Sequence, residues 1–358
     1  MNTTDHQYVL ELLDMAGAPL TEVRVTTDWE PARQWARLAA LRQHKVLPDE
    51  LTTTAIEPVW HSTVGQPYVS GFRVTLNADG RPALCVDFPI TYWKELAQQA
   101  SAPLVEEGRL KSGEDFLYQV AAYSLEAHRG EGRAHLFTVE ETQALLPCQE
   151  GRLADHLRRS VPVGLLTSHD VPVFVGPPVL EETDALKEAA GAHESGGILI
   201  GHLYRDGTVP ELFAEVTAQI PARYAPAEEM RLTFTPETWT DVQAAIELRA
   251  RGEIRLGWWH SHPRRHWSKA DGAACAASKG TAEFFSADDR LLHRAAFPAA
   301  YSIGLVVADT HLGGELWTTS WAAYGWRFGT IERRGFHLAE VRGVALAQEM
   351  HRYTGGEI

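Results

Sequence analysis

Apolar positions in the first part of the chain predict a mixture of helices and strands. Trp35, Leu38 and Leu41 recur at helical spacing after Asp28, which predicts a helix over about 28–41 with Asp28 as its cap. The apolar segments 68–76 and 83–88 flank the polar run 77–80, a pattern typical of a β-hairpin. Apolar residues three and four apart also predict a helix over 114–127. We therefore expect an α+β domain over residues 1–165.

Beyond about residue 165 the pattern becomes a regular alternation of apolar strands and helices. The expected strands cover 171–175, 197–204, 212–219, 254–259 and 301–308, and the expected helices cover 180–191 and 236–251. Strands interleaved with helices are typical of an α/β or α+β domain. We therefore expect a second domain over 166–335, followed by a C-terminal helix over 336–358.

Charge and cysteine content narrow the classes of function. The chain has 358 residues and a formal net charge of −14 with no Lys/Arg block, which argues against nucleic-acid binding. Its 3 cysteines form no disulfide framework and fit a reducing compartment. We see no secretory signal and no apolar run of about 18 residues. The expectation is a cytoplasmic protein with no membrane partner.

Candidate chemistry begins where the apolar strand 254–259 runs into His260-Ser261-His262-Pro263. Two histidines two residues apart on a strand point to the same side, so both imidazoles can reach one metal ion. Zinc sites that hydrolyse bonds use three protein ligands and leave one position open. A Ser-x-x-Asp run downstream offers a carboxylate as the third ligand, and Glu194 precedes an apolar, glycine-rich strand upstream.

These three separated elements resemble the signature of the JAMM (MPN+) zinc metallopeptidase family, in its bacterial type. The resemblance implies an MPN/JAMM, cytidine-deaminase-like fold, in which helices flank a mixed sheet. It implies that Zn²⁺ is bound by His260, His262 and Asp289. It also implies that Glu194 acts as the general base and that Ser286 stabilises the oxyanion.

The spacing departs from the family pattern, because residues 263–285 separate His262 from the serine, where the family has a short segment. A closer Ser-x-x-Asp lies at 268–271. We prefer Asp289 to Asp271 because a predicted helix follows Asp289 and leads into the strand 301–308. Asp271 is surrounded by glycine, alanine and serine, which offer a ligand no comparable support.

With Asp289 as the ligand, residues 264–285 form an insert beside the site. The insert contains His266 and Cys275. These two residues are either ordinary loop residues, or a fourth zinc ligand or a lid element near the metal; an inhibitory cysteine switch is a further alternative.

The resemblance implies a zinc-dependent isopeptidase or peptidase that removes or processes a ubiquitin-like protein. Its partners would be that protein or its conjugates, together with the associated activating and conjugating enzymes, and residues 1–165 would recognise one of them. Two alternatives stay open. The chain could be a non-catalytic MPN scaffold in a protein complex, or a hydrolase acting on small amino-acid conjugates of a sulfur-carrier protein.

Overall fold

The computed structural model describes residues 6–61, 67–124, 146–191, 193–223, 234–262, 283–313 and 316–339. The chain forms two compact units, one of Met1–Leu146 with Phe328–Thr330 and one of Pro147–Arg327 with Ile331–Ile358. The division falls earlier than the boundary expected at 165. The reason is strand pairing, since β7 (Gln149–Glu150) pairs with β10 and β8 (Val161–Val163) pairs with β16 in the second unit.

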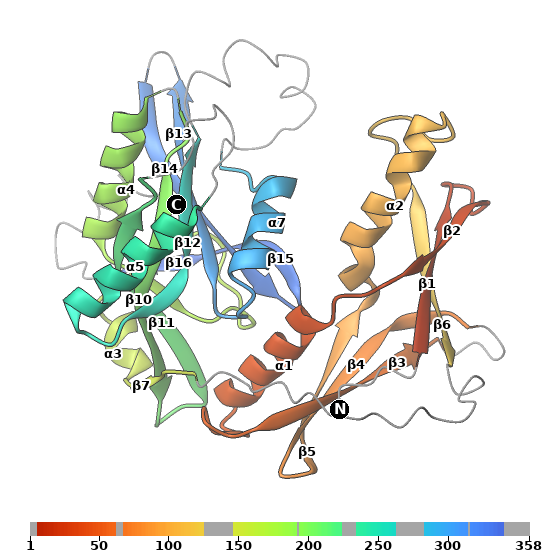
Figure 1. The fold of residues 1–358 in the computed structure, drawn as a ribbon, viewed down its shortest axis with the longest axis horizontal. Helices are drawn as coiled ribbons and strands as arrows, with labels where there is room; N and C mark the ends of the chain where they lie inside the picture. The colour runs from red at the N-terminus through yellow and green to blue at the C-terminus, as the bar shows by residue number, and fades with distance from the viewer. Residues whose placement is uncertain are drawn as a thin grey trace. The chain divides into compact units, whose positions relative to one another are not determined.

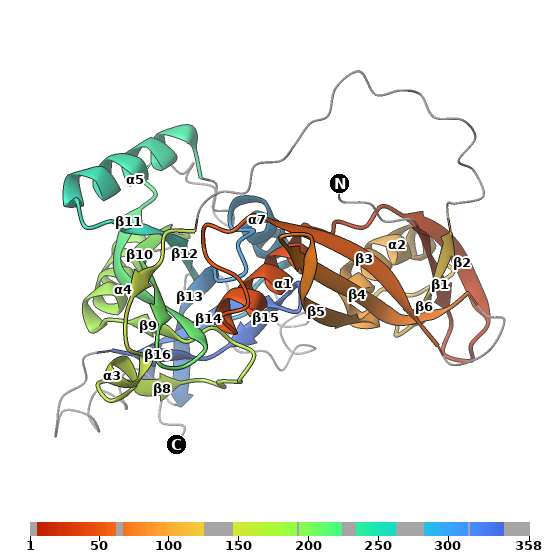
Figure 2. The same ribbon diagram turned by 90° about the horizontal axis from the view of Figure 1, so that it is seen from below.

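The first unit contains two three-stranded antiparallel sheets with the orders β2-β1-β6 and β3-β4-β5 (Figures 1 and 2). Helix α1 contacts β4 and β5, and α2 contacts β1. The aromatic rings of Trp29, Phe72, Phe88, Tyr92 and Trp93 pack together in the core of this unit. The elements are β1 (His6–Leu13), β2 (Pro19–Val25), α1 (Glu30–Arg42), β3 (Thr52–Trp60), β4 (Val69–Ala78), β5 (Arg81–Pro89), the 3₁₀ turn η1 (Ile90–Trp93), α2 (Lys94–Glu106) and β6 (Leu117–Ser124).

Two of the local predictions for this unit are confirmed. Helix α1 forms where expected, although its N-cap residue is Trp29, and Asp28 Oδ1 accepts the Glu30 amide at 3.0 Å. The hairpin β4–β5 turns at Asp79 and Gly80, whose φ angles are 48° and 72°. An Asp-Gly pair is favoured there because a two-residue hairpin turn needs positive φ at both positions.

The predicted helix over 114–127 is wrong. Leu117–Ser124 forms β6 and pairs with β1 along its whole length. Residues 125–127 lie outside the described ranges. Val120, Ala121 and Ala122 are buried in succession, so this strand lacks the alternation that would have distinguished it from a helix. Pairing with a strand distant in sequence decided its conformation.

The second unit has a mixed α+β fold built on a ten-stranded sheet with the order β15-β14-β13-β12-β10-β11-β9-β16-β8, and β7 beside β10 (Figure 1). Its strands after β8 are β9 (Val173–Val175), β10 (Gly196–Asp206), β11 (Glu211–Pro221), β12 (Ile254–His262), β13 (Ile303–Gly313), β14 (Leu316–Arg327), β15 (Thr330–Arg334) and β16 (Phe336–Leu338). Its helices are α3 (Leu153–Leu157), α4 (Pro177–Ala190), α5 (Pro236–Arg249) and α7 (Ala287–Ala296).

The prediction of a C-terminal helix over 336–358 is wrong at its first residues. Phe336–Leu338 is strand β16, which pairs with β8 and β9, and residues 340–358 lie outside the described ranges. Within the part of the chain that the structure describes, no helix combines the length and apolar composition needed to cross a membrane.

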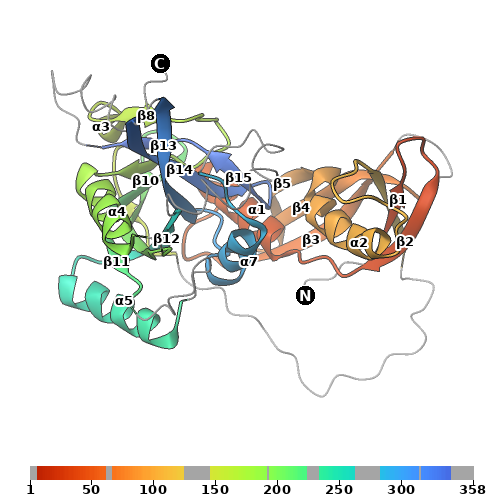
Figure 3. The ribbon, with the colours of Figure 1, turned by 90° about the horizontal axis from the view of Figure 1, so that it is seen from above.

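Strand β12 lies between α4 and α7, which cover opposite faces of the central strands (Figure 3). On one face, Trp259 Nε1 donates to Gln219 Oε1 at 3.0 Å, and the Gln219 amide donates to Glu182 of α4 at 3.3 Å. On the other face, Trp258 Nε1 donates to His293 Nδ1 of α7 at 3.0 Å. Consecutive residues of β12 therefore point to different helices, as the geometry of a strand requires.

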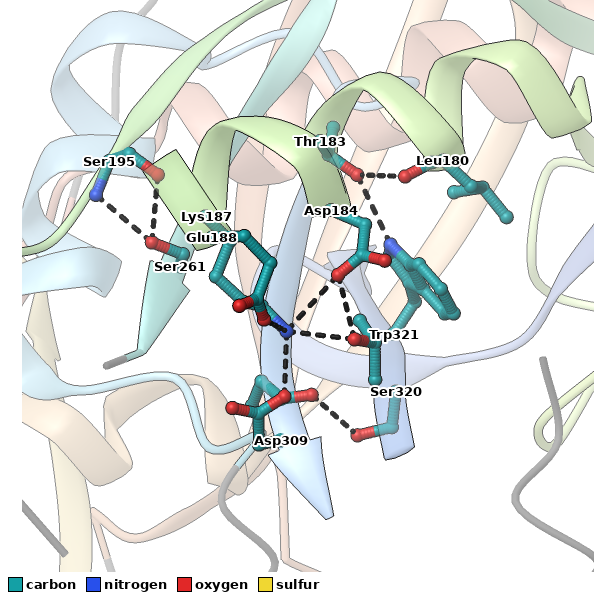
Figure 4. A network of polar contacts seen from close by, with 12 residues as sticks. Leu180, Thr183, Asp184, Lys187, Glu188, Ser195, Ser261, Asp309, Ser320 and Trp321 are labelled. Carbon is teal, nitrogen blue, oxygen red and sulfur yellow. Dashed lines mark hydrogen bonds and ion pairs between the residues drawn. The ribbon is translucent and has the colours of Figure 1, made fainter. Parts of the chain in front are cut away.

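A buried lysine fastens α4 to the sheet (Figure 4). Lys187, which is 5% exposed, donates to Asp309 Oδ1 of β13 at 2.6 Å and to Thr319 Oγ1 of β14 at 2.7 Å. Asp184 and Glu188 lie 3.1 and 3.2 Å from its Nζ. Burial lowers the pKa of Lys187, but its bonds to the Asp309 and Asp184 carboxylates outweigh burial and raise the pKa overall. The last turns of α4 are thereby tied to two strands.

We predict that Lys187→Met destabilises the protein by about 3 kcal/mol, because the substitution leaves the buried Asp309 carboxylate without its cation. Urea unfolding monitored by tryptophan fluorescence would measure the change. Glu188→Gln is the matched control, since it removes a partner whose side chain is 64% exposed and should cost less than about 1 kcal/mol. Equal losses for the two variants would contradict the role given to the buried pair.

Candidate metal centre

Three side chains expected to bind metal come together at the end of β12. The Nε2 atoms of His260 and His262 lie 3.1 Å apart, and His260 Nε2 lies 3.5 Å from Asp289 Oδ2. Within the described ranges these three residues form a group whose ligand atoms all lie within 4.8 Å of one another. The chain therefore places two imidazoles and one carboxylate around a common point.

Strand geometry places the two histidines, and a helix terminus places the aspartate. His260 and His262 share the α7 face of β12 because they are two residues apart. Asp289 lies in the first turn of α7, where its Oδ2 accepts the Ser286 amide at 2.7 Å and its own amide donates to Ser286 Oγ at 3.0 Å. This reciprocal pair is a capping box, which fixes the orientation of the carboxylate.

The segment before α7 is anchored to β14 and β15. Tyr324 donates its hydroxyl to the Glu283 carbonyl at 2.8 Å, and Arg333 pairs with the Glu283 carboxylate at 2.9 Å. Phe285 stacks on Tyr324 with ring centroids 4.6 Å apart. A Cβ at Gly304 of β13 would lie 2.9 Å from the Phe285 ring, so this packing needs a glycine there. These contacts fix the position of the segment that leads into Ser286 and Asp289.

The ionisation state of His260 suits a metal ligand. Its side chain is 1% exposed, and burial lowers its pKa to about 4 against the opposing effect of Asp289. The ring is therefore neutral at neutral pH, which is the form that binds metal. Trp258 stacks on it, with centroids 4.9 Å apart and an interplanar angle of 18°. His260 Nδ1 has no hydrogen-bond partner among the residues of the described ranges, which leaves Nε2 as the nitrogen directed at the cluster.

The donor set and spacing fit a zinc ion. Two ligand atoms about 2.0–2.1 Å from a tetrahedral zinc ion lie about 3.3 Å from each other. The observed separations of 3.1 and 3.5 Å lie on either side of that value. Two imidazoles and a carboxylate leave a fourth position for water or substrate, as in hydrolytic zinc sites. The donor set and these two separations therefore fit a zinc ion bound by the three residues.

Glu194 has an altered ionisation equilibrium. Burial, followed by the negative charge of Asp289, raises the pKa of Glu194 to about 7. In the metal-free protein Glu194 is therefore a buried carboxyl group with a perturbed pKa, which is typical of residues that act in acid/base catalysis. Glu194 lies two residues before the start of β10. This strand pairs antiparallel with β12 and places Gly196 opposite His260.

Ser286 Oγ can donate a hydrogen bond as well as accept one. The oxygen accepts the Asp289 amide, so the hydroxyl hydrogen stays available to donate to another group. The same capping box that orients Asp289 therefore holds a donor beside the cluster.

The remaining site predictions lie where the structure gives no description. Ser268, Asp271, His266 and Cys275, together with residues 264–282 of the expected insert, are outside the described ranges. The structure does bring Asp289 to the two histidines.

Sequence reasoning missed two features of the site. Phe284, which is 37% exposed, has its ring 4.7 Å from that of His262. Ser195 and Ser261 hydrogen-bond to each other beside Glu194 and the histidines. The alternation along β12 would have shown that Ser261 faces away from the metal, but no pattern in the sequence indicates its partner.

One protein family matches part of the chain. Residues 177–321 match the family described as prokaryotic homologs of the JAB domain, so this segment is a JAB/MPN-family domain, as the resemblance in sequence implied. A solved structure, that of protein DSY2949 from Desulfitobacterium hafniense, is similar over 47% of this chain and 93% of that one, at 19% identity and a TM-score of 0.31. No curated protein matches the chain.

We predict that the protein binds about one zinc ion per chain and that Asp289→Asn lowers this content strongly, because the variant loses a charged ligand. Asp288→Asn is the matched control. Its carboxylate belongs to the same first helical turn, so both variants lose a similar helix-dipole contribution of about 0.3–1 kcal/mol. Atomic absorption and thermal melting separate the two effects. Full zinc in Asp289→Asn, or equal loss in both, would remove Asp289 from the ligand set.

Proposed function

We propose that the second unit is a zinc-dependent JAMM-type peptidase that hydrolyses an amide or isopeptide bond of a ubiquitin-like protein. The observation that carries the proposal is the cluster of His260, His262 and Asp289, with Glu194 nearby and its pKa raised to about 7. Metal ligands, a tuned base and a hydroxyl donor are the groups that metal-assisted hydrolysis of an amide requires.

Each of the five site residues has one role in the proposed mechanism. A zinc ion held by the two imidazoles and the Asp289 carboxylate would acidify a water molecule and polarise the scissile carbonyl. Glu194, as the carboxylate, accepts the proton of the attacking water and delivers it to the leaving amine. Ser286 donates its hydroxyl hydrogen to the oxygen that becomes negatively charged during attack.

The substrate class and the partners are proposed from the matched family segment and from the division of the chain into two units. The JAB-family segment supports a peptide-like bond as the target. The first unit contains none of the five site residues, and we propose that it recognises the ubiquitin-like protein or its activating and conjugating enzymes. Phe284, exposed beside His262, is placed to contact the chain that enters the site. A cytoplasmic location belongs to the same proposal.

A substrate panel tests this function. Purified, zinc-loaded protein would be incubated with ubiquitin-like proteins carrying either a peptide-linked or a lysine-linked extension, and with small amino-acid conjugates of a sulfur-carrier protein. Cleavage of the protein fusions supports the proposal, and cleavage of the small conjugates alone favours the alternative hydrolase. Protein that carries no zinc and cleaves nothing would instead be a scaffold.

We predict that Glu194→Gln retains zinc but lowers kcat by about 100-fold or more, because the amide cannot accept a proton. Glu247→Gln, at an exposed glutamate of α5, should keep both zinc and turnover. Metal analysis and steady-state kinetics on the best fusion substrate give the result. A Glu194→Gln enzyme with near-normal kcat would exclude Glu194 as the base.

We also predict that Glu194→Gln stabilises the metal-free protein at pH 8 but not at pH 5. The pKa of Glu194 is about 7 in the folded state against an ordinary 4.5, so ionisation is disfavoured by folding. The wild-type protein therefore loses stability as the pH rises from about 4.5 through 7, and glutamine has no such dependence. Denaturant midpoints at the two pH values, with chelator present, test this. An advantage of the variant that does not grow with pH would contradict the raised pKa.

A further inference from the structure

Ser195 and Ser261 join the segment before β10 to the strand that carries the metal ligands. Ser261 Oγ accepts the Ser195 amide at 3.0 Å and lies 2.9 Å from Ser195 Oγ. The Ser261 amide donates to the Ser195 carbonyl at 2.8 Å. Ser261 is fully buried, at 0% exposed, so these bonds form away from competing water. Backbone and side chain together fix Ser195 against β12.

This pair lies on the face of β12 opposite the metal cluster. Ser261 follows the alternation of the strand and points to the same side as Trp259, whereas His260 and His262 point to the α7 side. Figure 4 shows the Ser195–Ser261 contact close to α4, with the Lys187–Asp309 contact beyond it. The serine pair therefore does not contact substrate or metal directly.

Glu194 is the residue next to Ser195. Ser261 bonds both the backbone and the side chain of Ser195, so the segment continues the β10–β12 pairing for one more residue. Adjacent side chains on an extended segment point to opposite faces. With Ser195 held on the α4 face, Glu194 is directed to the face that carries His260. The electrostatic effect of Asp289 on Glu194 agrees with that direction.

A second anchor holds the other end of the same segment. Lys187 fastens the last turns of α4 to β13 and β14, and the Ala190 carbonyl that ends the helix accepts the His193 amide at 3.2 Å. The short stretch that bears Glu194 thus runs between two points fixed on the sheet.

We propose that Ser261, through Ser195, is a positioning residue that holds the Glu194 carboxylate over the metal cluster. The inference rests on the proposed hydrolytic function of that cluster. A general base must lie within about 2.6–3.2 Å of the proton that it accepts. A displacement of 1 Å caused by a residue remote from the chemistry can lower the rate about 100-fold.

The test combines three serine variants with Glu194→Gln. Ser261→Ala removes both contacts to the Ser261 hydroxyl, Ser195→Ala removes only the contact between the two hydroxyls, and Ser261→Thr keeps the hydroxyl. We expect kcat to fall about 10- to 100-fold in Ser261→Ala and less in Ser195→Ala, with KM and zinc content unchanged. Ser261→Thr should recover most of the turnover.

A double-mutant cycle distinguishes positioning of Glu194 from a general structural defect. If Ser261 acts only through Glu194, adding Ser261→Ala to Glu194→Gln should not lower the residual kcat further. The same fold-loss in both backgrounds would overturn the proposal. Should Ser261→Ala fail to fold, the cycle is carried out with Ser195→Ala, whose remaining backbone contacts keep the strand pairing.

A spectroscopic measurement separates this proposal from the proposed function. With Co²⁺ in place of zinc, Glu194→Gln should alter the visible absorption bands, because Glu194 faces the open coordination position. Ser261→Ala should shift those bands in the same direction at unchanged cobalt content, and Ser261→Thr should not. A Ser261→Ala spectrum identical to that of the wild type would overturn the positioning role even if no substrate were cleaved.

Discussion

The burial of β12 on both faces is the constraint on which the second unit depends. The strand pairs antiparallel with β10 and parallel with β13, and helices cover both of its sides. Because side chains alternate, one face can carry the metal ligands while the other carries groups that hold the surrounding structure. His260 and His262 occupy the first face. Trp259 and Ser261 occupy the second and bond to residues on neighbouring segments.

Burial shifts the ionisation of two groups at the centre toward their neutral forms. His260 is buried and neutral, with one ring nitrogen lacking a partner among the described residues, and Glu194 has a raised pKa. The raised pKa of Glu194 lowers the stability of the metal-free protein as the pH rises toward 7, and shifted pKa values of this kind are typical of functional sites. Aromatic packing around Trp258 holds β12, and the Lys187 network ties α4 to the neighbouring strands β13 and β14.

The long segment between the second histidine and the serine is compatible with an intact centre because the chain is anchored again where the segment ends. Glu283 is bound by Tyr324 and Arg333, and Phe285 packs on Tyr324. From that point the capping box of Ser286 and Asp289 starts α7 at a defined place. The position of Asp289 then depends on local contacts after the segment and not on the segment's length.

The sequence alone determined the elements that depend on residues close together in the chain. The Asp-Gly hairpin turn, helix α1 and the two histidines on one side of a strand follow from backbone preference and alternation. The sequence also contains the JAMM-like signature, and the resemblance of that signature to the family indicated Glu194, Ser286 and Asp289. Tertiary structure alone decided what depends on distant partners. Leu117–Ser124 became a strand through β1, and residues 147–165 joined the second unit through β7 and β8. The pairing of Ser195 with Ser261 likewise appears only when β10 and β12 meet, because a hydrogen bond between residues far apart in the chain leaves no periodic trace in the sequence.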